Sequence, residues 1–539
     1  MNKIKLLGFI VLTFIANYGN AQTVPFEISL EPIDIDNLGG IQSYAYGQAN
    51  GKWLIIGGRL DGLHRRQPWA AFDIAGHNNQ LVVIDATNKQ KWSAHLTSLP
   101  TAIQEHLSTT NMQFYQKGNY LYILGGYGYS ATARDHITFD KLTAVKVSDV
   151  INAVIQKSSF LSYFRQISDA QFQVTGGRLK QINQTYYLLG GQKFMGRYNP
   201  MGPNNGPGFT QEYTNAIRKF KIFDNGTTLT VNHLNPHIDA ANLHRRDYNA
   251  EQQILTNGAE GITMFSGVFQ TNVDLPFLNS VTIDSNTYTV DNSFQQYYNH
   301  YHCPVLPIYS EKTKEMHTVF FGGIAQFYDS MGTLVQDDNV PFVNTIARVT
   351  RDKNGKMAEF KLPVAMPSLL GAGAEFIPNL NFPHFENEVF KMDSISKDST
   401  LIGYIFGGIA SSAPNIFFIN DGTQSSANQQ IFKVYIKEAS SVSTNQLNPA
   451  STSNLNLMIY PNPNDGVLNI SFNLVKKENV TLSIYDLKGA LLDRVKLPNL
   501  SQGVNHFQKK MDKFQNGNVY FISIETATQK ATHKLKVSD

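Results

Sequence analysis

The sequence predicts an all-β protein in two parts, a ring of six short antiparallel sheets followed by a small C-terminal Ig-like β-sandwich. First, a short apolar strand ending in two small residues, usually glycines, recurs six times along the chain. Second, 12% of the residues are aromatic and 40 are glycines, which suits short strands joined by tight turns. Third, short alternating strands follow a polar stretch near the C-terminus.

The N-terminus has the pattern of a secretory signal peptide. Two lysines precede an apolar run at residues 6–15, which is too short to span a bilayer, and small residues follow it. We therefore expect residues 1–21 to be a signal peptide that is removed after Ala21. No later apolar run is long enough to cross a membrane, so the sequence predicts no integral membrane segment.

The charge pattern argues against nucleic acid as a partner. Charged residues make up 16% of the chain, the net charge is +3, and both signs are spread along the sequence without a basic stripe. Cys303 is the only cysteine, so no disulfide can form within one chain. Stability must therefore come from core burial and from closure of the fold.

Each repeat contains a strand that ends in Gly-Gly, and in most copies an earlier strand precedes it across an Asn/Gly turn, as at 42–46 and 111–115. In the fourth copy Ser266 replaces the first glycine. Glycine tolerates the crowding that is expected where inner strands approach a central channel. The copies occupy residues 53–58, 121–126, 187–191, 262–267, 319–323 and 404–408.

A longer pattern extends the first repeat. Its two glycines are followed by an apolar third strand at 81–85, a turn at 88–90 and Trp92. This succession resembles the Kelch repeat, and six such units resemble a six-bladed Kelch-like β-propeller. The resemblance covers residues 22–439, which we expect to form one propeller domain.

The sixth blade has no fourth strand of its own. Its third strand, 431–436, runs into a polar segment at 440–453, which we interpret as a flexible linker. Near the start of the mature chain, residues 25–30 alternate apolar and polar side chains, as a half-buried strand does. We predict that this segment supplies the missing strand, closes the ring and removes exposed sheet edges.

Residues 454–539 form a separate segment that has a short motif near its start. Near their start, prolines of fixed φ and a turn glycine precede the first strand, in a motif made of Tyr460, Pro461, Asn462, Pro463 and Gly466. The segment resembles the C-terminal sorting domain of the type IX secretion system of Bacteroidota. The resemblance implies that the type IX secretion machinery is a partner and that the protein is secreted or attached to the outer cell surface. The alternative is an adhesive Ig-like domain that stays on the protein.

Two copies of the triplet His-Arg-Arg are the candidate ligand-binding residues. In antiparallel blades, the long loops after each Gly-Gly and the segments that enter each blade lie on one face. The first triplet follows the glycines of blade 1 and the second enters blade 4, so we expect them at one mouth of the channel, opposite each other. Guanidinium groups pair with carboxylates and sulfates, and a tryptophan can stack on a sugar ring. The predicted site residues are His64, Arg65, Arg66, Trp69, His244, Arg245 and Arg246. The alternative is that these arginines are solvated or pair with nearby aspartates.

The sequence predicts no metal site, no cofactor and no catalytic residue. His300 and His302 share one face of a strand while Cys303 points away, and two ligands do not complete a metal site. Galactose-oxidase-like enzymes also have a Kelch propeller, but the residues around Cys303 do not match their copper site.

We therefore predict a secreted or surface-attached binding protein whose propeller loop face takes a glycan or a protein ligand. The alternative is a propeller enzyme that acts on an acidic sugar, either mutarotase-like or a hydrolase. An enzyme is expected to hold a carboxylate or a histidine deep in the channel mouth beside the arginines, in a perturbed environment. A binding protein needs only a broad loop surface.

Overall fold

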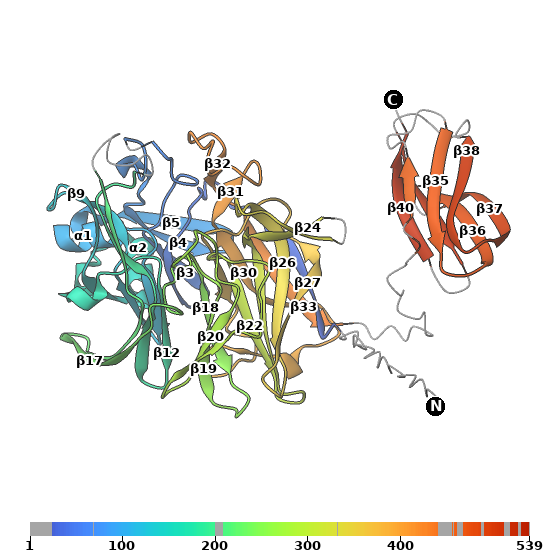
Figure 1. Cartoon of the computed structure of the whole chain (residues 1–539). Helices are drawn as coiled ribbons and strands as arrows, with labels where there is room; N and C mark the ends of the chain where they lie inside the picture. The colour runs from blue at the N-terminus through green and yellow to red at the C-terminus, as the bar shows by residue number, and fades with distance from the viewer. Residues whose placement is uncertain are drawn as a thin grey trace, which may run out of the picture. The chain divides into compact units, whose positions relative to one another are not determined.

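The computed structural model describes residues 24–67, 69–199, 208–330, 333–439, 455, 457–460, 467–486, 490–510, 518–526 and 530–537. Pro25–Ala439 forms one compact unit, and the C-terminal strands belong to another (Figure 1). The predicted signal peptide, the predicted linker and the stretch Pro461–Gly466 of the sorting motif lie outside the described residues.

The larger unit is built from antiparallel sheets that follow one another along the chain (Figure 1). The first three sheets, with strands in spatial order, are β2 (Ala45–Ala49), β3 (Lys52–Ile56), β4 (Gln80–Asp85) and β5 (Gln90–His95); β6 (Gln113–Lys117), β7 (Tyr120–Leu124), β10 (Lys141–Lys146) and β11 (Phe164–Ser168); and β12 (Arg178–Ile182), β13 (Thr185–Leu189), β16 (Ala216–Asp224) and β17 (Leu229–Ile238).

The next three sheets repeat this plan with two variations. They are β18 (Asn249–Ile254), β19 (Glu260–Phe265), β20 (Ser280–Ile283) and β21 (Tyr288–Asp291); β22 (Val305–Ser310), β23 (Glu315–Ile324), β26 (Phe342–Arg351) and β27 (Met357–Ala365); and β28 (Ala374–Pro378), β30 (Thr400–Gly407), β33 (Ile431–Glu438) and β1 (Phe26–Ile33). The fifth sheet gains a short parallel strand, β29 (Phe390–Lys391), beside β22. The sixth takes its outer strand from the other end of the chain.

The six sheets of the described residues stand in a closed ring. An apolar cluster lies between each sheet and the next, and the last cluster joins Phe406 of the sixth sheet to Tyr44 and Trp53 of the first. Alternate residues along each strand point to opposite faces, so every blade can pack against both neighbours. The unit is therefore a six-bladed β-propeller.

The first strand closes the ring. β1 pairs antiparallel with β33, with Phe26 opposite Glu438 and Ile33 opposite Ile431. Phe26 and Ile28 are buried between the fifth and sixth blades. The prediction that the segment after the signal peptide completes the sixth blade is confirmed.

The Gly-Gly pairs sit where neighbouring blades touch. In five blades the N–H of the second glycine donates a hydrogen bond of 2.7 or 2.8 Å to a carbonyl that enters the next blade, as Gly126 does to Val174. At blade 4, Ser266 occupies the first position with φ near +53°, and its hydroxyl donates to the Phe277 carbonyl at 2.7 Å. Gly267 makes no equivalent blade-to-blade bond to any described residue. The weaker repeat therefore coincides with a weaker seam.

The loops after the glycines carry additional hairpins and the first two blades carry helices. The hairpins are β8 (Tyr127–Ser130) with β9 (Asp135–Thr138), β14 (Gln192–Met195) with β15 (Thr210–Tyr213), β24 (Phe327–Ser330) with β25 (Thr333–Gln336), and β31 (Ile409–Ser411) with β32 (Ser425–Ala427). The helices are α1 (Thr101–Leu107) and α2 (Val147–Gln156). In α2, Val147, Val150, Ile151 and Val154 form one buried face at helical spacing, and this face packs into the cluster between blades 1 and 2.

The C-terminal unit is a two-layer β-sandwich. One sheet holds β34 (Met458–Tyr460), β35 (Val467–Leu474) and β38 (Gly503–Lys510), and the other holds β37 (Leu491–Leu500), β36 (Glu478–Tyr485), β39 (Val519–Glu525) and β40 (Lys530–Lys536). Alternate residues of both sheets, among them Ile470, Leu482 and Ile522, fill the space between them.

Candidate functional site at the mouth of the propeller channel

A closed ring of backbone hydrogen bonds surrounds the channel at the face where the Gly-Gly loops lie. One residue just before each inner strand takes part, and its N–H donates to the carbonyl of the equivalent residue in the neighbouring blade at 2.7–3.1 Å. Starting from blade 1, the ring members are Ser43, Asn111, Gly176, Asp247, His302 and Gly373, and Ser43 donates to Gly373 to complete the circle.

The residue types of the ring follow from its backbone geometry. Five of the six members have φ between +49° and +69°, the left-handed region, and His302 is the exception. Glycine enters this region freely, and Asn, Asp and Ser do so at a smaller cost than bulkier residues. The ring therefore explains Gly176, the first glycine of a Gly-Gly pair that lies outside the six strand-ending copies.

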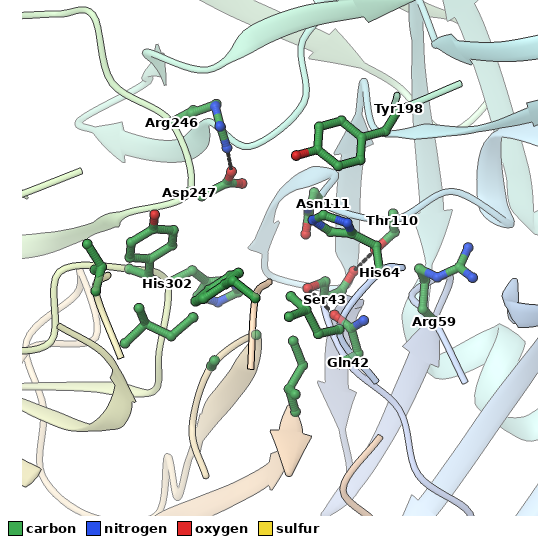
Figure 2. A pocket seen from close by; sticks show the side chains of 18 of the residues that line it. Gln42, Ser43, Arg59, His64, Thr110, Asn111, Tyr198, Arg246, Asp247 and His302 are labelled. Carbon is green, nitrogen blue, oxygen red and sulfur yellow. Dashed lines mark hydrogen bonds and ion pairs between the residues drawn. The ribbon is translucent and has the colours of Figure 1, made fainter. Parts of the chain in front are cut away.

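A pocket of about 490 Å³ lies above this ring. Its floor contains Ser43, Asn111, Asp247, His302 and Gly373 of the ring together with the residue that precedes each of them. Its walls come from the loops of several blades and include two aspartates, Asp274 and Asp338, and five aromatic residues, Phe72, Tyr198, Phe269, Phe417 and Phe418. Figure 2 shows the Arg246–Asp247 pair on one side of the pocket and Tyr198, His64 and Arg59 on the other.

The first triplet contributes two of its three residues to the pocket. The His64 ring stacks on Phe72 with 4.9 Å between centroids, and burial lowers the His64 pKa to about 4, so the imidazole is neutral at physiological pH. The Arg66 guanidinium lies over the Phe418 ring, 4.9 Å from its centroid, and no carboxylate of the described residues pairs with it. Arg65 is exposed and lies outside the lining.

The second triplet contributes only Arg246. This guanidinium pairs with Asp247, donates to the Tyr213 hydroxyl at 3.0 Å and lies 5.0 Å from the centre of the Phe269 ring. His244 is outside the lining, where it stacks on Tyr213 with 3.7 Å between centroids. The two triplets thus reach one pocket from opposite blades.

The structure corrects the expectation for Arg245. This side chain is fully buried, and its guanidinium donates to the carbonyls of Asn242 and Ser266, both at 2.6 Å, while it lies over the Phe277 ring. Burial lowers its pKa to about 9. Arg245 therefore holds the entry of blade 4 in place and is not available to a ligand. Trp69 is 72% exposed and does not line the pocket either.

Sequence reasoning missed Arg59, which follows the blade 1 glycines directly. Arg59 is largely buried in the pocket lining, donates to both carboxylate oxygens of Asp61 and lies 5.4 Å from the centre of the Phe72 ring. The signal was its position, because in four blades the residue after the strand-ending pair bridges to the residue before a ring member, as Arg59 does to Gln42.

Charged and titratable groups close the channel below the pocket. His302 Nε2 lies 2.8 Å from the Glu375 carboxylate, and Arg178 lies 3.5 Å from the same oxygen across the channel. Burial alone would raise the pKa of Glu375, but His302 and Arg178 hold it below its usual value. Burial lowers the pKa of His302, and Arg178 lowers it further. A buried histidine and a buried carboxylate thus lie close together below the pocket.

His300 and Cys303, which the sequence offers as possible metal ligands, are both buried in the protein. The His300 ring is buried, with Nε2 at 2.8 Å from the Gln296 carbonyl, and its Nδ1 accepts a hydrogen bond from the Gln326 N–H at 3.0 Å. Burial raises the pKa of the Cys303 thiol to about 12, so it stays protonated. In the described part of the chain, no group of three His, Cys, Asp or Glu side chains is placed to hold a metal ion.

Comparison with known proteins identifies the tail. Residues 458–538 match the family described as the secretion system C-terminal sorting domain. This match supports export by the type IX secretion system and implies contact with its machinery, and the protein is accordingly secreted or located on the outer cell surface. None of the described helices is long and apolar enough to cross a membrane.

The propeller has distant structural likenesses. One is to the structure of YjhT, with a TM-score of 0.38 and 10% identity over 74% of this chain and 98% of that one. Another is to a glycoside hydrolase family 43 arabinoxylan arabinofuranohydrolase from Bacillus subtilis, with a TM-score of 0.28 and 10% identity over 92% of this chain and 94% of that one. No curated protein matches the chain in sequence. Likeness at this level assigns neither a ligand nor an activity to this chain.

Proposed function

We propose that the protein is a secreted or surface-attached binding protein of the Kelch-like propeller class. The repeated placement of Gly-Gly at the blade seams supports the Kelch-like assignment, since five seams use it in the same hydrogen bond. The pocket above the backbone ring is the ligand site of this proposal. Its ligand is an extracellular glycan or protein that presents an acidic group.

The observation that carries this proposal is the state of the three arginines that line the pocket, of which Arg59 is paired with Asp61. Arg246 is paired with Asp247, which leaves its charge compensated, whereas Arg66 has no carboxylate partner among the described residues. A guanidinium without a partner inside an aromatic pocket attracts a carboxylate or a sulfate, which it can bind through two parallel hydrogen bonds. The aromatic walls add stacking surface for a sugar ring or a ligand side chain.

A glycan array probed with the purified protein, and a parallel array of immobilised extracellular proteins, test the proposal. Arg66→Ala should weaken binding of acidic ligands about tenfold, which corresponds to one charge-assisted hydrogen-bonded pair. Arg65→Ala is the matched control, because this arginine belongs to the same triplet but is exposed outside the pocket. Equal binding by the wild type, Arg66→Ala and Arg246→Ala would exclude the pocket as the acidic-ligand site.

A second candidate function is an enzyme that acts on an acidic sugar. The His302–Glu375 pair favours it, because a histidine and a carboxylate lie at the pocket floor below the arginines in a buried setting. Glycans that bind on the array can be incubated with the protein and followed by proton NMR for anomeric exchange and for cleavage. Turnover that Glu375→Gln abolishes, with binding retained, would establish the enzyme. Binding without any turnover supports the binding protein.

A further inference from the structure

The channel opens into a second pocket at its other end. This pocket has a volume of about 240 Å³ and is separated from the first by narrow spaces of about 20 and 80 Å³ around Arg178 and Glu375. It is lined by inner strands of several blades and by the segment between β28 and β30. The two pockets therefore present independent surfaces to solvent.

Aromatic rings dominate the second pocket. Its lining includes Tyr46, Phe114, Tyr115, Phe376 and Phe390. Tyr46 and Phe114 meet edge to face with 5.3 Å between centroids, and the Tyr46 hydroxyl donates to the Phe376 carbonyl at 3.0 Å, so this wall is fixed in place. The face of an aromatic ring attracts a cation within about 6 Å.

Three charged residues line the second pocket, and two of these side chains pair with each other. Lys180 and Glu251 form an ion pair of 2.6 Å and compensate each other. Glu388, on the segment between β28 and β30, lines the same pocket, and its carboxylate makes no ion pair or hydrogen bond with any described residue. Burial raises the pKa of the Glu388 carboxyl group, and the nearby Lys180, His384 and Lys117 oppose this increase. The lining thus contains one more carboxyl group than cationic side chains.

A buried acceptor points to the same ligand chemistry. Gln252 lines the second pocket and is 3% exposed, and its side-chain oxygen accepts no hydrogen bond from the described residues. A buried acceptor left without a donor is costly, and a ligand N–H group would satisfy it. The acidic carboxylate, the free acceptor and the aromatic wall all favour a donor that carries positive charge.

We propose that this second pocket binds an organic ammonium group, such as a lysine side chain or an amino sugar presents. Glu388 supplies the countercharge, Gln252 accepts an N–H bond, and Tyr115 and its aromatic neighbours cover the alkyl part. This site takes a ligand of charge opposite to that proposed for the first pocket. It does not depend on the function proposed there.

The test uses the full-length protein and n-butylammonium as the probe, with binding followed by ligand-observed NMR. The isosteric but uncharged n-butanol shows how much of the affinity comes from the charge. Glu388→Gln keeps the size of the side chain and should weaken n-butylammonium binding about tenfold. Glu386→Gln is the matched control, because Glu386 is in the same segment but does not line the pocket, and it should leave binding unchanged.

Saturable binding of n-butylammonium that exceeds n-butanol binding and that Glu388→Gln alone weakens supports the site. Absence of saturable binding to the wild type would overturn it. Equal affinity of the wild type and Glu388→Gln, or equal losses in Glu388→Gln and Glu386→Gln, would also overturn it, because the carboxylate would then act elsewhere or only through general surface charge.

Discussion

Replacing the first glycine of a blade seam should destabilise the propeller far more than replacing an equally left-handed glycine in a free turn. Gly125 has φ +66°, and a Cβ added to it would overlap the Val174 carbonyl oxygen of the next blade. That carbonyl accepts the Gly126 N–H at 2.8 Å, so Gly125→Ala pushes the blades apart at their hydrogen bond. Gly118 lies in the same blade with φ +57°, and a methyl group added there would meet no other atom within 4 Å.

The magnitudes follow from these two environments. A left-handed alanine costs about 1–2 kcal/mol at either position. At Gly125 the lost blade-to-blade hydrogen bond adds about 1 kcal/mol, and overpacking adds roughly 1–3 kcal/mol. We therefore expect Gly125→Ala to lower the free energy of unfolding by roughly 3–6 kcal/mol and Gly118→Ala by about 1–2 kcal/mol.

Tryptophan fluorescence in a urea titration is the appropriate assay. All three tryptophans, Trp53, Trp69 and Trp92, lie in blade 1, so the signal reports on the propeller and not on the C-terminal sandwich. The comparison of midpoints between the two alanine variants isolates the seam contact from the backbone cost. Equal midpoints for Gly125→Ala and Gly118→Ala would refute the steric account of the Gly-Gly repeat.

Three further predictions concern closure, a buried charge and pH. Phe26→Ala should lower the free energy of unfolding by about 3–5 kcal/mol in the same urea assay, because Phe26 is buried where β1 closes the ring. Glu27→Gln, on the opposite face of β1, is the control and should change this free energy by less than about 1 kcal/mol. Asp224→Asn should lower the free energy of unfolding by roughly 3–5 kcal/mol, because the largely buried Arg165 guanidinium, 2.6 Å from Asp224, then has no counterion. An unchanged midpoint in the urea titration would contradict this prediction. Burial lowers the pKa of His317 to about 3, so below its ordinary pKa near 6.5 this histidine takes up a proton in the unfolded chain but not in the folded chain. The free energy of unfolding should therefore fall by about 1.4 kcal/mol per pH unit between pH 6.5 and 3. Urea titrations at several pH values should show that this free energy depends less steeply on pH in His317→Gln.

Much of the fold could be predicted from the sequence because its signals are local. The six strand-ending repeats mark the second strand of each blade, and the alternating pattern at 25–30 identifies the closing strand β1. The sequence pattern starts the inner strands two or more residues too early, at 42–46 and 111–115, whereas β2 begins at Ala45 and β6 at Gln113. Ser43 and Asn111 belong to the backbone ring, which a strand pattern cannot reveal.

The candidate site was harder to predict because it depends on which way each side chain points. The sequence brings two identical triplets to one face, yet Arg66 and Arg246 reach the pocket while Arg65 is exposed outside it and Arg245 is buried. Neighbouring arginines of a triplet point in different directions, and neither composition nor spacing tells which of them faces the pocket. The His302–Glu375 contact joins blades 5 and 6 and has no counterpart in the local sequence.

In the backbone ring at the channel mouth, main-chain atoms hold the blades together while side chains are left to contact a ligand. Its six members hold one another through main-chain atoms, so the hydrogen bonds of the circle do not themselves involve side chains, and five of the members have a left-handed φ. At the two glycines an added side chain would crowd Asp247 or Ser43, whereas a serine, an asparagine, an aspartate and a histidine display different chemistries from the other four places. Substitution of single non-glycine residues of the backbone ring should thus change which ligands the pocket binds without changing the fold. These positions are therefore suitable starting points for engineered variants with altered specificity.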